Sequence, residues 1–271
     1  MRGRCFSRKS GNYHEKGACM NEKQWAAFCQ FRDEFRKKCE EWSRFSCILK
    51  PLQEAAAEKD TPEYSVENPV VYNSDFDSFT EQSEIKLIVI GDNPGKNEQL
   101  DKNRRYLVGQ AGKIAQGFFA RNPEFGIDFR KNVIILNKTP VHTAKTNHLK
   151  ALKAADSEIE QLILQSQVWM AEKTAWLHQA LFECAGQKRV ELWLVGYAEL
   201  KGNGLFLPYR NSFSAAYQKN DDVWASVKVF QHFSMNRFLI DLKDFSKNNS
   251  EIALAKNLSL LGDRHKLEIF G

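Results

Sequence analysis

The sequence predicts an α/β fold: a three-layer α/β/α domain around a central, mostly parallel four-stranded sheet, with an N-terminal helical extension. Four short, apolar, β-branched segments are visible, and helical patterns separate them along the chain. Such alternation is typical of a parallel sheet that helices cover on both faces. The 271 residues, 42% of them hydrophobic, are enough for one sizeable core.

The N-terminal third predicts a helix followed by a linker. Residues 1–20 are polar and irregular, which indicates loose order. Residues 21–47 predict an amphipathic helix, because large apolar side chains recur at helical spacing, namely Trp25, Phe28, Phe35, Trp42 and Phe45. Residues 51–84 hold three prolines and many acidic residues, which indicates loop. We therefore expect residues 1–84 to form a helical extension and linker packed on an α/β domain of residues 85–271.

The α/β domain begins with the first clear strand, residues 85–90, which ends at Gly91. The pattern then predicts a helix over 111–120, a strand over 133–136, and a long helix over 157–184 that begins with a capping box of Ser157 and Glu160. The remaining segments predict strands over 190–195 and 227–230 joined by a loop, a short helix near 235–242 and a last helix within 248–271.

Polar side chains follow the predicted strands at the points where they end. Asn93 follows the first strand, Asn137 the second and His232 the fourth. Ligands of parallel sheets bind outside the carboxyl ends of the strands. Amides and imidazoles read amide edges and polarise carbonyls, so these three residues are the candidates for a site.

Phosphate-binding motifs do not account for the first of these loops. In Gly91-Asp92-Asn93-Pro94-Gly95-Lys96 the two glycines are one residue too close for a P-loop, and Asn97 replaces its hydroxyl residue. The G-x-G-x-x-G dinucleotide fingerprint is absent. A strand-to-loop turn that uses glycine and proline for geometry alone remains an alternative.

Four segments, in order, resemble motifs of the uracil-DNA glycosylase superfamily. Residues 88–95 resemble the G-x-N-P-G form of motif one, and residues 106–112, Tyr-Leu-Val-Gly-Gln-Ala-Gly, resemble a P-F-V-G-x-A-G segment. Residues 133–137 resemble the strand whose final Asn reads the base, and residues 231–237 resemble the H-P-S motif. The resemblance spans residues 85–240 and implies a DNA-repair glycosylase that hydrolyses the N-glycosidic bond of uracil, or of a related damaged or mismatched base, after base flipping.

The resemblance also implies roles for single residues. Asn93 would orient the attacking water, His232 would donate a hydrogen bond to the base carbonyl, and Asn137 would match N3–H and O4 of uracil. Because Asn93 cannot act as a base, we expect slow turnover. The other residues expected to line the base pocket are Gly91, Asp92, Pro94, Gly95, Tyr106, Leu107 and Ser234.

The chain departs from the family pattern at three places. Leu107 stands where an aromatic ring stacks on the flipped base, so Tyr106 is an alternative for that role. Gly95 stands where the uracil-strict branch has a tyrosine, which leaves room for a thymine methyl group. Phe233 replaces the usual proline of H-P-S.

The expected partner is lesion-containing DNA, with no membrane partner and a monomeric state. The net charge of +5 permits a polyanionic partner without establishing one. Met235 is a candidate wedge for the gap that a flipped base leaves. The other expected DNA contacts are Lys96, Arg104, Arg105, Asn236 and Arg237, with Lys102, Lys138 and Lys145 as further basic residues in the same loops.

No cofactor or metal is expected. The six cysteines form no C-x-x-C pair, and Lys138-Thr139-Pro140-Val141 stands where the iron–sulfur branch has K-C-R-P. Reduced thiols and the lack of a long apolar run or signal core predict a soluble, cytoplasmic protein.

Two other functions remain open. One is a non-catalytic protein of the same fold that binds nucleic acid or another protein, which the departures at Leu107 and Phe233 favour, together with Asn93, which stands where the most active branch has an aspartate. The other is a different α/β enzyme that handles a nucleotide or phosphate.

Overall fold

The computed structural model describes residues 19–61, 63–182, 189–217 and 221–271. Its centre is a four-stranded sheet of order β2-β1-β3-β4 in which every neighbouring pair is parallel. The predicted three-layer α/β/α class is therefore confirmed. The strands are β1 (Leu87–Gly91), β2 (Val133–Asn137), β3 (Glu191–Val195) and β4 (Val227–Phe230), each within two residues of its predicted bounds.

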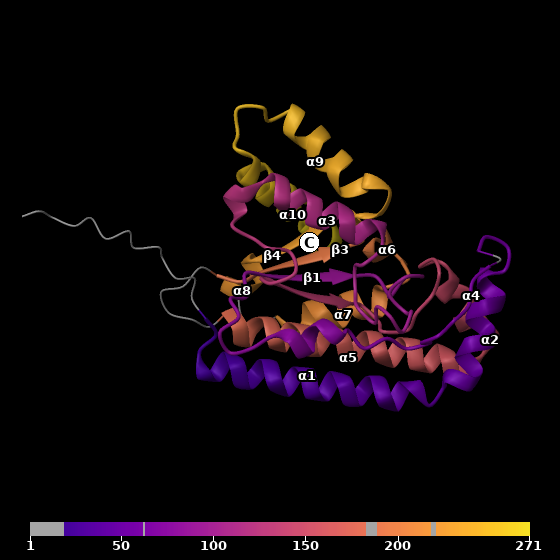
Figure 1. The fold of residues 1–271 in the computed structure, drawn as a ribbon. Coiled ribbons are helices and arrows are strands. Elements are labelled where there is room, and N and C mark those ends of the chain that lie inside the picture. The colour runs from indigo at the N-terminus through magenta and orange to yellow at the C-terminus, as the bar shows by residue number, and fades with distance from the viewer. Residues whose placement is uncertain (1–18, 62, 183–188, 218–220) are drawn as a thin grey trace, which may run out of the picture.

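Helices cover both faces of this sheet (Figure 1). On one face lie α3 (Gln110–Arg121), α9 (Arg237–Lys247) and α10 (Leu254–Phe270), and on the other lie α5 (Ser157–Phe182) and α7 (Leu207–Ala216). Because helices cover both faces of the sheet, β1 and β2 are buried along their whole length. Their sequences are therefore nearly continuous apolar runs.

The N-terminal helix α1 (Glu22–Ser43) lies outside α5 as a further layer (Figure 1). It begins with a capping box between Asn21 and Gln24. Phe28, Phe31 and Phe35 have no exposed surface and belong to the same hydrophobic core as the sheet. The predicted amphipathic helix is confirmed, and its buried face makes the extension part of one continuous core.

A second helix, α2 (Ser46–Ala57), corrects the predicted linker. Proline removes one backbone hydrogen bond from a helix interior, and we expected Pro51 to lie in a loop. Leu49, Gln53 and Ala57 are nonetheless buried along one face of α2, so packing outweighs the local cost of Pro51. The rest of the predicted linker is mostly irregular, with a 3₁₀ turn η1 (Ser74–Ser78).

Short helices in the second half were also missed by the sequence prediction. The loop predicted between the third and fourth strands holds three helices, and another helix precedes α5. Short helices carry too few turns to show a clear period. The elements concerned are α4 (His148–Ala155), α6 (Tyr197–Leu200), α7 and α8 (Asp221–Ala225), with 3₁₀ turns η2 (Pro123–Phe125) and η3 (Ser234–Asn236).

The start of α5 differs from the predicted capping box. The Asp156 carboxylate accepts the backbone N–H groups of Glu158 and Ile159 at 2.8 and 3.0 Å, so Asp156, and not Ser157, caps this helix. The predicted continuation of the helix to residue 184 lies outside the described residues, as does most of the polar segment 1–20.

The strand order creates a switch point beside β1. The chain leaves β1 for β2 on one side, whereas β3 pairs with β1 on the other side. In open parallel sheets, the crevice at such a point, outside the carboxyl ends, is the usual ligand site. Gly91 and Asn137 lie opposite each other in the register at this edge, where two of the predicted site residues therefore meet.

Candidate active site

A buried ion pair lies at the carboxyl edge of the sheet. Lys138 Nζ lies 2.5 Å from Asp92 Oδ1 and also donates to the carbonyl of Val195 at 2.5 Å. The Lys138 side chain has no exposed surface, and burial lowers the pKa of its amine. This pair ties the ends of β1, β2 and β3 together. It also corrects the prediction that Lys138 contacts phosphate, because its amine is enclosed by protein groups.

Two glycines permit the close packing at this edge. A Cβ atom on Gly91 would lie 2.4 Å from Asn137 Oδ1, and one on Gly196 would lie 2.2 Å from Asp92 Oδ1. Gly196 also has a φ of +94°, a conformation that glycine adopts readily. The glycines that end the first and third strands therefore make room for Asn137 and Asp92.

Asn137 presents an unused hydrogen-bond donor. Its side chain is 2% exposed, and Nδ2 has no partner among the described residues. A buried amide nitrogen without a partner costs about 1–3 kcal/mol. Such a group is unusual in a folded protein, and it lies at the position that the sequence predicts for base reading.

His232 is held as a neutral hydrogen-bond donor. Its Nδ1 accepts the backbone N–H of Ser234 at 3.1 Å and lies 2.7 Å from Ser234 Oγ. A backbone N–H can only donate, so Nδ1 carries no proton and the neutral ring carries it on Nε2. Burial lowers the pKa of His232, with Lys138 adding to the effect and Asp92 opposing it. The ring therefore stays neutral while Nε2–H is free to donate.

Asn93 lies at the same edge and is anchored by its amide nitrogen. Nδ2 donates to Thr143 Oγ1 at 2.8 Å and to the carbonyl of Val141 at 3.2 Å. Among the described residues no group donates to Oδ1, and the residue is partly exposed. The predicted water-orienting residue therefore offers an acceptor.

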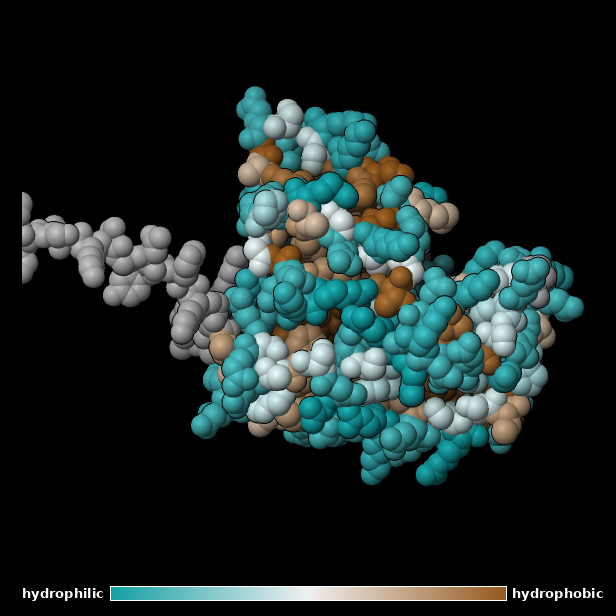
Figure 2. Space-filling view, viewed as in Figure 1, coloured by the Kyte–Doolittle hydropathy of each residue, from teal (hydrophilic) through white to brown (hydrophobic). Residues whose placement is uncertain are grey.

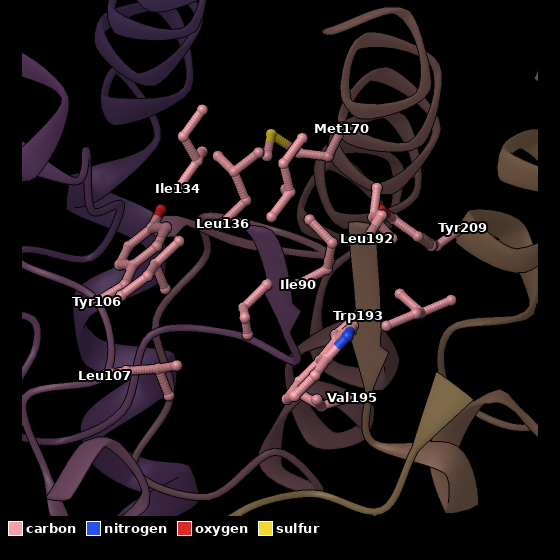
Figure 3. Close-up of a cluster of buried hydrophobic side chains, with 14 of the residues drawn as sticks. Ile90, Tyr106, Leu107, Ile134, Leu136, Met170, Leu192, Trp193, Val195 and Tyr209 are labelled. Atoms are coloured by element: carbon pink, nitrogen blue, oxygen red, sulfur yellow. The ribbon is translucent and has the colours of Figure 1, made fainter. Parts of the chain in front are cut away.

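Tyr106 and Leu107 lie differently from the stacking prediction. Tyr106 is fully buried and its hydroxyl donates to the carbonyl of Val71 at 2.5 Å. Figure 3 shows both side chains among the buried hydrophobic residues. Tyr106 is a core residue and does not offer its ring to a ligand, so the alternative that it stacks on a base is wrong. Leu107 is 4% exposed with a φ of +51°, and it remains the candidate.

The loop that carries Leu107 is fixed from several sides. Arg130 Nη1 donates to the carbonyl of Tyr106 at 3.0 Å, and Nη2 donates to that of Leu107. A Cβ on Gly112 would lie 1.5 Å from the Leu107 carbonyl oxygen. The start of α3 therefore packs against this loop only because residue 112 is glycine.

No protein-family model, curated protein or solved structure matches this chain.

Glu98 is a site-forming residue that the sequence prediction missed. It is buried, and its carboxyl group accepts the backbone N–H groups of Gly95, at 3.2 Å, and Leu107. Burial raises its pKa to about 7. Glu98 links motif one to the Leu107 loop, a contact for which the sequence gives no signal because its partners are backbone groups.

His142 was also missed. Its Nδ1 lies 2.8 Å from the carbonyl of Pro94, which also accepts the backbone N–H of Thr143 at 3.2 Å. Burial lowers the pKa of His142 to about 4. Gln53 of α2 donates to the His142 carbonyl at 2.7 Å, so the extension supports motif one from behind. Pro94 itself is buried, whereas the space beside Gly95 is open.

Phe233, at the position where the resemblance would place a proline, packs into the core. It is fully buried and its ring lies 5.1 Å from that of Phe238, nearly edge-on. After it, Met235 and Asn236 both have positive φ, at +52° and +56°. Met235 is 74% exposed, so the loop that positions His232 presents an apolar side chain to solvent, as the predicted wedge requires.

The predicted phosphate-contacting residues divide into two groups. Arg105 pairs with Asp75 at 2.5 Å and Lys145 with Asp60 at 2.7 Å. Exposed residues with no carboxylate partner within 4.0 Å in the described chain are Lys96, Lys102, Arg104 and Arg237. Figure 2 shows a largely hydrophilic surface with small hydrophobic patches on the viewed side. The unpaired group is better suited to a polyanion.

In the part of the chain that the structure describes, no three His, Cys, Asp or Glu side chains are grouped so that they could hold a metal ion. Cys19, Cys29, Cys39 and Cys47 are free thiols. No helix in the described part of the chain is both long and apolar enough to cross a bilayer.

Proposed function

We propose that this protein is a DNA glycosylase that hydrolyses the N-glycosidic bond of uracil or of a related damaged or mismatched base. The observation that carries the proposal is the buried, unpartnered Nδ2 of Asn137 at the carboxyl edge of the sheet. This nitrogen is one of several buried polar atoms without a partner among the described residues, and it is distinguished by its place at the end of β2, beside the switch point of the sheet; a ligand acceptor would satisfy it. The amide can donate to O4 of uracil and accept from N3–H, a pattern that cytosine reverses.

The chemistry would use the groups around that amide. A base inside a duplex is out of reach, so the nucleotide must first be flipped into the crevice. As the bond from base to sugar breaks, negative charge develops on the base. His232 Nε2–H would donate to the uracil O2, and a preorganised donor of this kind contributes about 2.7–4 kcal/mol. Neutral imidazole performs this role without losing its proton.

Water would be oriented by Asn93. Its Oδ1 accepts a hydrogen bond from the water, which directs a lone pair toward the anomeric carbon. An amide does not remove the proton of the water, which passes to the departing uracil anion once the bond from base to sugar has broken. The neighbouring Asp92 carboxylate is paired with Lys138. Because neither Asn93 nor Asp92 then acts as a base, we expect turnover to be slow.

Variants of Asn137 test the proposal directly. In a single-turnover assay, the wild-type protein should release uracil and leave cytosine intact. Asn137→Ala should slow uracil release by about tenfold or more, and Asn137→Asp, which replaces the donor by an acceptor, should favour cytosine over uracil. Equal uracil release by the wild type and Asn137→Ala, or none by either, would contradict the proposal.

A non-catalytic DNA-binding protein is the second candidate. The aliphatic Leu107, 4% exposed, at the expected stacking position favours it. In that case salt-dependent binding, followed by fluorescence anisotropy, should survive in the double variant Asn93→Ala, His232→Ala. Detection of a released base by the wild-type protein would exclude this candidate.

A further inference from the structure

The amide of Asn93 has two ends of the same shape and opposite hydrogen-bonding character. With Oδ1 toward a bound water it accepts a hydrogen bond from that water, and with Nδ2 toward the water it donates one. The residue itself does not decide between them. The decision lies with the groups that Nδ2 contacts, which are the carbonyls of Val141 and Pro94 and the hydroxyl of Thr143.

All three of these groups act as acceptors. The carbonyls of Val141 and Pro94, 3.2 and 3.4 Å from Nδ2, can only accept. Thr143 Oγ1, 2.8 Å from Nδ2, donates its own proton to the Lys145 carbonyl at 2.8 Å, which leaves its lone pairs for Asn93. We infer that Thr143, the nearest of the three acceptors, is a positioning residue that holds Nδ2 of Asn93 and leaves Oδ1 as the end available to a ligand.

The backbone around Thr143 is suited to this role. Its N–H donates to the Pro94 carbonyl at 3.2 Å, and the His142 N–H donates to the Pro69 carbonyl at 3.0 Å. Thr143 is 1% exposed, so water does not compete for its hydroxyl. The acceptor is therefore held in a fixed place beside motif one, by contacts that also involve the N-terminal extension.

The orientation matters for the proposed reaction, on which this inference rests. Oδ1 accepts a hydrogen bond from the water and leaves both lone pairs of the water oxygen free, so that one can point to the sugar carbon. A flipped amide would instead donate to the water oxygen and occupy one of those lone pairs. Thr143 contacts neither the water nor the base in this account, and it acts through Asn93.

A set of matched variants tests the role of Thr143. Thr143→Val keeps the shape and removes the acceptor, and it should lower the single-turnover rate of uracil release about tenfold with little change in DNA affinity. Thr143→Ser should recover most of that loss. Thr146→Val is the control, because the Thr146 side chain makes no hydrogen bond with any described residue. In an Asn93→Ala background, Thr143→Val should have no further effect.

A second readout does not depend on activity. With asparagine labelled by ¹⁵N, the Asn93 side-chain signal is identified by its loss in Asn93→Asp. Thr143→Val should shift that signal and speed its hydrogen exchange, and Thr146→Val should not. An unchanged Asn93 signal in Thr143→Val, or equal rates in an active protein, would overturn the inference. A wild-type protein that releases no base would refute the proposed glycosylase, while the NMR result would still decide how Asn93 is held.

Discussion

At the scale of single residues, the candidate site consists of side chains that use some of their hydrogen-bonding atoms within the protein and leave others without a partner among the described residues. Asn137 keeps a buried donor unused, and Ser234 fixes the tautomer of His232. The sequence indicated these residues through their positions after strands. It did not indicate Thr143 or Glu98, because their contacts join segments that lie far apart in the chain or use backbone groups.

A methyl group at Gly91 should disturb the site without touching a ligand. Its Cβ would lie 2.4 Å from Asn137 Oδ1, so Asn137 must move. We expect Gly91→Ala to slow base release about tenfold or more, since small misplacements of a positioning group cost rate steeply. Gly109→Ala is the matched control, because its Cβ would meet Asn97 Nδ2 at an ordinary 3.7 Å. Equal rates for the two variants would contradict the placement of Asn137.

Loss of Lys138 should destabilise the fold strongly. Breaking a buried ion pair leaves the other charge unpaired and typically costs about 3–5 kcal/mol. We expect Lys138→Met to lose about that much unfolding free energy in urea titrations. The double variant Asp92→Asn, Lys138→Met should recover a large part of it, because no charge is left buried. A double variant as unstable as the sum of the single ones would show that the pair does not act as a unit.

At the scale of elements, the strands place the site and the loops after them define it. The bounds of all four strands were predicted from apolar, β-branched runs, since burial on both faces leaves a strong signal. Their order in the sheet was not predicted, and neither was α2, where packing of Leu49 and Gln53 overrides Pro51. Local pattern therefore predicted the strands and the long helices, whereas tertiary contacts decided the order of the strands in the sheet and the helix that contains Pro51.

The Glu98 link between two loops should make stability depend on pH. Its pKa of about 7 in the folded protein lies above the ordinary 4.5, so the folded state binds the proton more tightly than the unfolded state. The stabilisation that comes from this tighter proton binding is fully present below about pH 4.5 and is lost as pH rises through about 7. Its size is at most about 3 kcal/mol.

Urea titrations from pH 5 to pH 8 measure this effect. Wild-type protein should lose more stability over that range than Glu98→Gln, because the amide side chain of the variant does not ionise. Parallel pH profiles of the unfolding free energy for the two proteins would show that the pKa of Glu98 is the same in the folded and unfolded states.

At the scale of the whole molecule, the N-terminal extension and the α/β part share one core. Phe35 is fully buried, and its ring lies 6.1 Å from that of Trp169 in α5 and 5.5 Å from that of Tyr72. Side chains from the same extension reach the site, as Gln53 does at His142. The sequence predicted that this segment packs on the core, but not that it supports the loops of the candidate site.

A core substitution in α1 should therefore unfold the protein as a unit. We expect Phe35→Ala to cost about 3–5 kcal/mol of unfolding free energy in a single cooperative transition. Ile48→Ala, at a position that is 37% exposed, should cost far less. Two separate transitions, with the α/β part unaffected by Phe35→Ala, would show that the extension folds independently.

The most direct test of the central claim is base release from a panel of oligonucleotides by the wild type and His232→Ala side by side. The panel carries uracil, hypoxanthine and mismatched thymine, and uracil is presented both opposite guanine and in a single strand. We predict that the wild type leaves abasic sites at one or more of these bases and that His232→Ala is about 10²–10³-fold slower. Equally little abasic product from both proteins across the whole panel would contradict the account.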